Sequence, residues 1–332
     1  MTKQKWLRLL AALMCCLLLT SCSAKPADDS GAAILPTASA DEPIDPAKKT
    51  TGVGFYFDTV VSLTLWGAPE GLVDEVWAEC ARYEKLLSKT IPGSDVSRIN
   101  GAMGKPVTVD PETWDILRRA KEISTLTGGA FSITIAPVTA LWTFTGTLSN
   151  SVPTDEARLS ALPLVDDQKI ELGENNTVTL PAGMQIDLGG IAKGYTSATV
   201  AQLYRDLGVT SGLINLGGNV QTVGLKPDGS EWRIGIQHPE DENAMLGVVT
   251  THDEAVITSG GYERNFEEDG VVYHHIIDPS TGYPADSGLI SVSIVSEDGT
   301  LADGLSTSLF IMGKDKAIEY WKAHSKDFDF VL

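Results

Sequence analysis

Two neighbouring histidines, His274 and His275, stand where an apolar run meets a turn, and they are two of the chain's five histidines. Asp278, Pro279 and a Thr-Gly pair follow closely and predict that turn. We expect both histidines to lie on a strand, so that only one of them faces a given cleft. A histidine at a strand end could act as a general base or bind phosphate. A satisfied structural histidine is the alternative interpretation.

Asp303 and Thr307 are four residues apart at the start of an expected helix, which places them on one face. A carboxylate, a hydroxyl and a nearby backbone carbonyl are hard oxygen ligands of the kind that Mg²⁺ takes together with a phosphate. An Asp that caps the helix, beside a Thr that faces the core, would give the same spacing. Both interpretations stay open for this pair.

Three glycine pairs each follow a short apolar segment, at 189–190, 217–218 and 260–261. Glycine at a strand end lets the backbone approach a ligand and offers its amides to an anion. A helix after residue 190 would add a favourable dipole. Asp187 and Lys193 flank this first pair, and a lysine near a helix N-terminus is best explained by a bound negative group. Tight turns and an exposed lysine are the alternatives.

The common nucleotide motifs are missing from the sequence. It contains no Walker A segment, no GxGxxG after the first strand, no HExxH and no cysteine pair for zinc. The formal net charge is −19, from 25 basic and 44 acidic residues. This charge argues against nucleic-acid binding and against a basic membrane-binding patch, and it makes an anionic substrate dependent on a local cation.

The first 22 residues have the pattern of a bacterial lipoprotein signal. Lys3, Lys5 and Arg8 precede an apolar stretch from 9 to 19 that is too short to span a bilayer easily. Leu-Thr-Ser then precedes Cys22, which would be lipidated and would anchor the protein outside the cytoplasm. An ordinary signal peptide with a chance cysteine is the alternative. Removal of three basic residues would leave 22 against 44, or −22.

These signals divide the chain into three parts. Residues 1–21 are the expected signal peptide, 22–50 are the lipidated cysteine with a disordered tether rich in Ala, Pro, Asp and Ser, and 51–332 are the folded domain. Cys15 and Cys16 would be removed, so Cys80 alone remains and no intrachain disulfide can form. Cys80 falls on the apolar face of an expected helix, where we expect a buried, unreactive thiol.

The elements that must position these residues are strands in runs and helices in blocks. Alternation over 54–67 predicts one strand, and apolar spacing predicts helices over 71–89, 110–128 and 190–208, with two more at the C-terminus. Short strand candidates follow one another between residues 213 and 296. This order predicts an α+β fold with a largely antiparallel sheet.

Eight segments, taken in order, resemble the ApbE-type FAD:protein FMN transferases over residues 53–324. They are "FDTVVSLTLWG", "LLSKTIPGSDVSRIN", "GGAFSITIAPVTALW", "IDLGGIAKGY", "LINLGGNV", "WRIGIQHP", "VITSGGYERNFEEDGVVYHHIIDPSTGYP" and "ADGLSTSLFIMG". The resemblance implies a two-lobed, T-fold-like architecture with FAD in the cleft between the lobes. It also implies Mg²⁺-dependent transfer of FMN from FAD to a threonine hydroxyl of a partner protein, with release of AMP. The implied partners are redox-complex subunits or FMN-binding lipoproteins, and the implied place is the extracytoplasmic side of the membrane.

The resemblance also assigns residues by position. His275 matches the histidine implicated in catalysis. The metal ligands would be the side chains of Asp303 and Thr307 and the carbonyl of Gly190, with Ser306 adjacent. FAD would contact Phe57, Thr90, Ala130, Phe131, Ser132, Asp187, Lys193 and Ile277.

The chain departs from the family pattern at two predicted flavin contacts. Phe57-Asp58-Thr59 replaces the frequent Met-Gly-Thr, and Thr90 stands where some members carry an aromatic residue. A further strand hairpin would also be expected after the last residues, "FDFVL". Three alternatives to the transferase remain: a Mg²⁺-dependent FAD pyrophosphatase, a flavin- or solute-binding lipoprotein without turnover, and a lipid-anchored structural domain.

Overall fold

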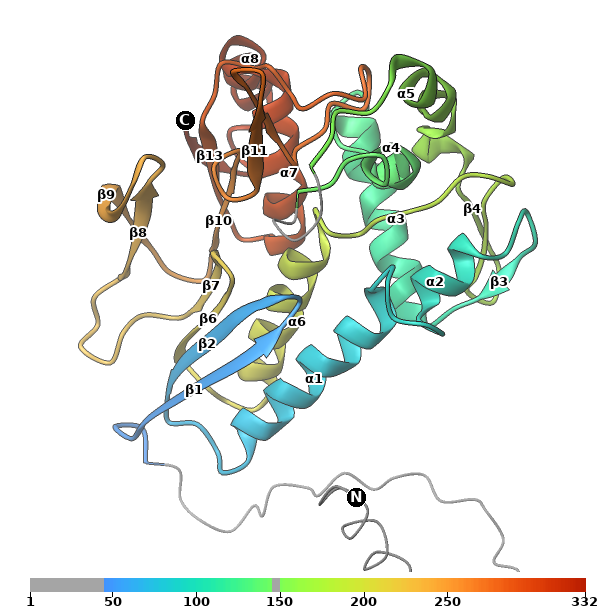
Figure 1. Ribbon diagram of the computed structural model, residues 1–332. Coiled ribbons are helices and arrows are strands. Elements are labelled where there is room, and N and C mark those ends of the chain that lie inside the picture. The colour runs from blue at the N-terminus through green and yellow to red at the C-terminus, as the bar shows by residue number, and fades with distance from the viewer. Residues whose placement is uncertain (1–44, 145–149) are drawn as a thin grey trace, which may run out of the picture. The chain divides into compact units, whose positions relative to one another are not determined.

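The computed structural model describes residues 45–144 and 150–332, which belong to a single unit of the chain (Figure 1). The expected signal peptide, Cys22 and most of the tether lie outside the described residues. Within the described ranges, no helix is both long enough and apolar enough to cross a membrane.

A seven-stranded sheet forms the centre of the fold, and every neighbouring pair of its strands is antiparallel. This confirms the predicted α+β class with a largely antiparallel sheet. In spatial order the strands are β1 (Lys49–Tyr56), β2 (Thr59–Trp66), β6 (Ser211–Leu216), β7 (Asn219–Val223), β10 (Ala255–Gly260), β13 (Ser291–Ser296) and β14 (Asp329–Val331).

Four helices pack on this sheet: α1 (Leu72–Leu87), α6 (Ala192–Asp206), α7 (Gly299–Met312) and α8 (Lys314–His324). Alternate residues of β2, such as Val61 and Leu63, are buried against α1 and α6. Ile257 and Ile294 of the other half of the sheet are buried in a second cluster with α7 and α8. The period-two pattern of the strands therefore places one face of the sheet under the helices.

A second region lies beside the sheet and its helices (Figure 1). It contains α2 (Asp95–Asn100), α3 (Pro111–Leu126), α4 (Ala136–Thr139), α5 (Asp155–Ala161) and a small sheet of β3 (Val107–Thr108), β5 (Thr177–Thr179) and β4 (Glu171–Gly173). Two hairpins complete the described elements: β8 (Trp232–His238) with β9 (Asp241–Thr251), and β11 (Asn265–Glu268) with β12 (Val271–His274).

Local sequence signals place several helix ends. The Asp110 side chain accepts from Glu112 N at 2.9 Å and Pro111 is the first residue of α3, as predicted. Cys80 lies fully buried in α1, and burial raises the pKa of its thiol to about 12. The expected burial of Cys80 is confirmed, and a raised pKa disfavours the reactive thiolate form.

The single strand expected over 54–67 is wrong, because the segment is the β1–β2 hairpin. Its two-residue turn is Phe57-Asp58, and both residues have positive φ, 54° and 56°. A turn of two residues shifts the alternation by one position, so the more buried residues are even-numbered in β1 and odd-numbered in β2, and the interpretation as one strand overlooked this shift. Positive φ strains a phenylalanine, and the Glu84 carboxylate fixes the turn by accepting from Phe57 N at 2.7 Å.

Candidate active site

One cavity of about 480 Å³ brings together segments from the whole described chain. Its wall includes the β1–β2 turn, the end of α1, the start of α6, the ends of β7 and β10, the chain after β12, and α7. All the residues predicted for flavin, metal and catalysis except Ser306 line it: Phe57, Thr90, Ala130, Phe131, Ser132, Asp187, Gly190, Lys193, His275, Ile277, Asp303 and Thr307. Residues predicted for flavin, metal and catalysis therefore share one ligand-sized space.

His275 lies one residue beyond β12, so its predicted place on the strand is wrong. Its backbone N donates to Arg264 O at 3.0 Å, and its Nδ1 lies 3.3 Å from the same oxygen. A carbonyl can only accept, so Nδ1 carries the proton and Nε2 keeps its lone pair. Burial, together with the charges of Arg264 and Lys193, lowers the pKa of His275 to about 4. A neutral imidazole with a free Nε2 can accept a proton at neutral pH.

His274 has a different environment and does not line the cavity. Its Nε2 donates to Ala285 O at 3.1 Å, and its Nδ1 accepts from Ile276 N at 3.3 Å. Its ring packs edge-on against Phe310, with centroids 5.3 Å apart, and burial lowers its pKa. His274 is therefore the satisfied structural histidine of the pair.

The start of α6 lies directly against α7 because glycines remove side chains from the contact. A Cβ built on Gly194 would lie 2.3 Å from Gly299 O and 2.6 Å from Asp303 Cβ. A Cβ on Gly190 would lie 3.7 Å from Thr307 Oγ1. The contact brings Gly190, Asp303 and Thr307 to the same part of the cavity wall.

Asp303 is buried, and its Oδ2 accepts from Gly194 N at 2.8 Å. Thr307 Oγ1 lies 3.3 Å from Ser259 Oγ. Ser306 is buried beside them, where its hydroxyl donates to Asp303 O at 2.8 Å and lies 2.7 Å from Ser259 Oγ. Ser306 thus supports the neighbouring segment from outside the cavity, and its predicted adjacency to the ligands is one of sequence.

These oxygen donors suit a hard divalent cation. Asp303 and Thr307 line the cavity beside Gly190, and the missing Cβ of Gly190 leaves its backbone close to Thr307 Oγ1. In the part of the chain that the structure describes, no group of three or more His, Cys, Asp or Glu side chains is arranged to hold a metal. The predicted set contains one carboxylate, so such a group is not required for it.

Asp187 has a partner that the sequence did not suggest. Lys89 Nζ contacts its Oδ2 at 2.6 Å, and Gly189 N donates to its Oδ1 at 2.9 Å. Lys193, predicted to meet a negative group, also lines the cavity. Asp187 therefore shapes the glycine turn and holds a second lysine at the cavity wall.

Four charged residues of the cavity wall escaped the sequence analysis: Glu84, Lys89, Glu263 and Arg264. Desolvation raises the pKa of Glu263 although Lys193 and Arg264 act in the opposite direction. Lys89 stands in "LLSKT" and the pair 263–264 in "GGYERNF", both segments that carried the resemblance. The position of Lys89, Glu263 and Arg264 inside these segments was the signal from which they could have been predicted as residues of the site.

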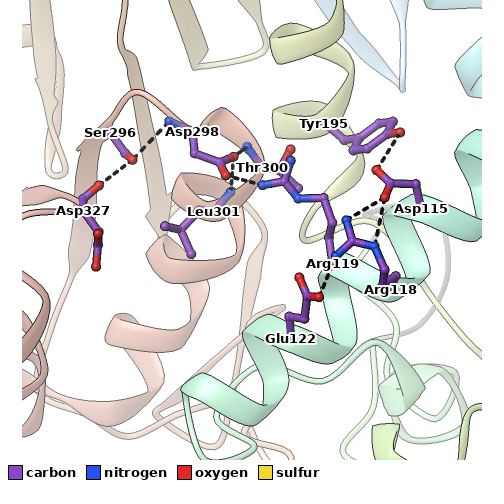
Figure 2. Close-up of polar contacts among 10 residues, drawn as sticks. All are labelled: Asp115, Arg118, Arg119, Glu122, Tyr195, Ser296, Asp298, Thr300, Leu301 and Asp327. Atoms are coloured by element: carbon purple, nitrogen blue, oxygen red, sulfur yellow. Dashed lines mark hydrogen bonds and ion pairs between the residues drawn. The ribbon is translucent and has the colours of Figure 1, made fainter.

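A polar network connects α3 to both helices of the site (Figure 2). Asp298 caps α7 by accepting from Thr300 N and Leu301 N at 3.0 Å, and it forms an ion pair with Arg119 of α3. Tyr195 of α6 donates to Asp115 of α3 at 3.4 Å. Through these contacts, α3 of the second region is bonded to α6, which carries Lys193, and to α7, which carries Asp303.

Comparison with known proteins identifies the family of this chain. The ApbE family model matches residues 57–332, so the chain belongs to the ApbE family. It is 40% identical over 261 residues to an FAD:protein FMN transferase of Klebsiella pneumoniae (strain 342), covering 77% of this chain and 80% of that protein. An FAD:protein FMN transferase of Treponema pallidum (strain Nichols) is 37% identical over 262 residues, covering 74% and 72%.

Solved structures show the same fold. The crystal structure of the ApbE protein of Thermotoga maritima superposes with a TM-score of 0.79 at 33% identity, covering 85% of this chain and 93% of that chain. The apo form of the Pseudomonas stutzeri flavinyl transferase ApbE gives a TM-score of 0.76 at 28% identity, covering 86% and 94%. The fold expected from the resemblance is confirmed.

Proposed function

We propose that this protein transfers the FMN part of FAD to a threonine hydroxyl of a partner protein and releases AMP. Membership of the ApbE family, whose relatives are named FAD:protein FMN transferases, makes the chain such a transferase. The observation that carries the mechanism is the neutral His275, whose Nδ1 proton is held by Arg264 O at the wall of a ligand-sized cavity.

The proposed step is a displacement at the phosphorus atom of the FMN half. The acceptor oxygen forms a new P–O bond, the bond between phosphorus and the bridging oxygen of the pyrophosphate breaks, and AMP leaves with that oxygen. His275 Nε2 takes the proton of the acceptor hydroxyl. Placing the base and both reactants in one cavity supplies orientation as well as proton transfer.

Positive groups at the cavity wall offset the charge of the pyrophosphate. Lys193 and Arg264 line the cavity, and Lys193 stands in the first turn of α6, where the helix dipole also favours an anion. In a chain of net charge −19 such local cations are needed to bind an anionic substrate.

We infer that Mg²⁺ is the metal of this site, held by the Asp303 carboxylate, the Thr307 hydroxyl and the Gly190 carbonyl. When bound, it would neutralise phosphate charge and stabilise the leaving group. The protein's own contribution is the α6–α7 contact, which keeps these oxygens together through Gly194 and Gly299.

The acceptor and the location of the protein are further parts of the proposal. The signal pattern that ends at Cys22 supports a lipid anchor on the extracytoplasmic face of the membrane. The acceptor would then be a redox-complex subunit or an FMN-binding lipoprotein exposed on that face, with a threonine that reaches the cavity.

The test uses the full-length protein in detergent micelles with FAD, Mg²⁺ and a candidate FMN-accepting domain. A fluorescent acceptor band on a denaturing gel, together with AMP, is the expected result. AMP with free FMN and no band would support the pyrophosphatase. Bound FAD without either product would support a binding lipoprotein and would overturn the proposal.

A further inference from the structure

The short turn between β10 and β11, residues 261–264, supplies the group that orients His275. Arg264 O accepts both the backbone N and the Nδ1 proton of His275. The side chains of Glu263 and Arg264 from the same turn line the cavity. The geometry of this turn therefore fixes the proton on the imidazole and places two charged groups of the site.

Asn265 holds this turn from its end. Its side-chain Nδ2 donates to Gly261 O at 3.2 Å and to Tyr262 O at 2.9 Å. Its backbone begins β11 and lies opposite His274 in the β11–β12 hairpin. One amide group thus connects the first carbonyls of the turn to β11, which pairs with β12, the strand that leads directly to His275.

The turn has little freedom to rearrange while these contacts persist. A Cβ on Gly261 would lie 2.7 Å from His274 Cδ2, so the turn packs directly against the half-buried ring of His274. Gly261 N also donates to Ile290 O at 3.2 Å. Loss of the Asn265 amide would release the two carbonyls between this fixed point and Arg264.

We propose that Asn265 is a positioning residue for FMN transfer, because its amide keeps the 261–264 turn in the form that places Arg264 O against His275 Nδ1. The role rests on the proposed function, since it concerns the base of that reaction. It differs from a purely structural role because it specifies the tautomer of one histidine.

The experiment compares the full-length protein with Asn265→Asp, which is nearly isosteric but cannot donate, and with Glu268→Ala as a control. Glu268 is exposed on the same strand, and among the described residues its side chain has no hydrogen bond. Proteins labelled with ¹⁵N-histidine are examined by long-range ¹H–¹⁵N NMR, and His275 is assigned by its loss in His275→Ala.

We expect the Nδ1-protonated tautomer for His275 in the parent and in Glu268→Ala, and a mixture of tautomers in Asn265→Asp. The kcat of transfer should fall about tenfold in Asn265→Asp, with the Kd for FAD within about twofold, as expected for a misplaced base. If Asn265→Asp does not fold, Asn265→Ser, which keeps one weaker donor, is measured in its place.

An unchanged tautomer in the Asn265 variant would overturn the proposal, even if its melting temperature or kcat fell, because the residue would then be structural only. A parent that transfers FMN to no acceptor would instead refute the proposed function. The tautomer comparison needs no turnover, so the two failures are distinguishable.

Discussion

The pKa of His275 predicts the pH dependence of FMN transfer. Burial and the charges of Arg264 and Lys193 lower this pKa to about 4, whereas a solvated histidine has a pKa of about 6.5. The folded protein therefore keeps His275 neutral, and competent as a base, at pH values where an ordinary imidazole is protonated. Activity should be retained as the pH falls through 6.5 and should be lost only as it approaches 4.

The difference is largest near pH 5.5. An imidazole with a pKa of about 6.5 is roughly 10% neutral there, and one with a pKa of about 4 is roughly 97% neutral. The rate at pH 5.5 should thus be close to that at pH 7.5 instead of about tenfold lower. The pyrophosphate of FAD has no titrating group in this interval, but Glu263 also lines the cavity and its raised pKa must be separated from that of His275.

The assay measures AMP release and acceptor fluorescence between pH 5 and 8 at FAD concentrations well below KM, where the pH dependence reports the pKa of the free enzyme, with circular dichroism to verify folding at each pH. Glu263→Gln serves as the control, since it removes the second titrating group. His275→Ala should lower transfer by about 10²–10⁴-fold at every pH while FAD binding survives. A half-maximal rate near pH 6.5 in both the parent and Glu263→Gln would refute the inferred environment of His275, and normal transfer by His275→Ala would remove it from the mechanism.

Three further predictions concern the scaffold of the site. Gly194→Ala should destabilise the fold by roughly 3 kcal/mol, because its Cβ would lie 2.3 Å from Gly299 O and α6 and α7 would have to separate. Urea unfolding of the variant and the parent measures the difference. An unchanged unfolding midpoint would contradict the close contact. Asp58→Gly should raise the free energy of unfolding by about 0.5–1 kcal/mol, because φ at this position is 56° and glycine adopts this angle without strain. A loss of stability in the same urea experiment would show that the Asp58 side chain makes a favourable contact. Asp303→Ala should abolish transfer and its response to added Mg²⁺, measured by AMP release across a Mg²⁺ titration. Asp303→Asn, which keeps an oxygen for Gly194 N, is the matched variant, and full Mg²⁺-dependent activity in both would refute the metal assignment.

The sequence predicted those parts of the fold that depend on local signals. Asp110 and Pro111 mark the start of α3 by capping chemistry, and the stripe of apolar residues that includes Cys80 marks the buried face of α1. The hairpin at Phe57-Asp58 escaped because Phe57 is untypical of a turn with two positive φ values, although Asp58 is a common residue there. Its conformation depends on Glu84, which is 27 residues away and becomes a neighbour only in the folded chain.

The site was predicted where side-chain type and short spacing carry the chemistry. Asp303 and Thr307 do lie on one helix and line one cavity. The contact between Lys89 and Asp187 joins residues 98 positions apart, and no local pattern indicates it. The partner of His275 Nδ1 is a backbone carbonyl, which every residue possesses, so the identity of Arg264 gives no clue to that role.

Asp303 shows why the structural and the functional interpretations of one residue need not compete. The alternative to a metal ligand was an aspartate that caps its own helix, but Asp298 performs that function for α7. Asp303 instead accepts from Gly194 N in the first turn of α6. A buried carboxylate requires such a donor, and the dipole of α6 favours its negative charge. The bond occupies Oδ2 and leaves Oδ1 for a ligand, so the contact that stabilises the buried charge also holds the carboxylate in the cavity wall.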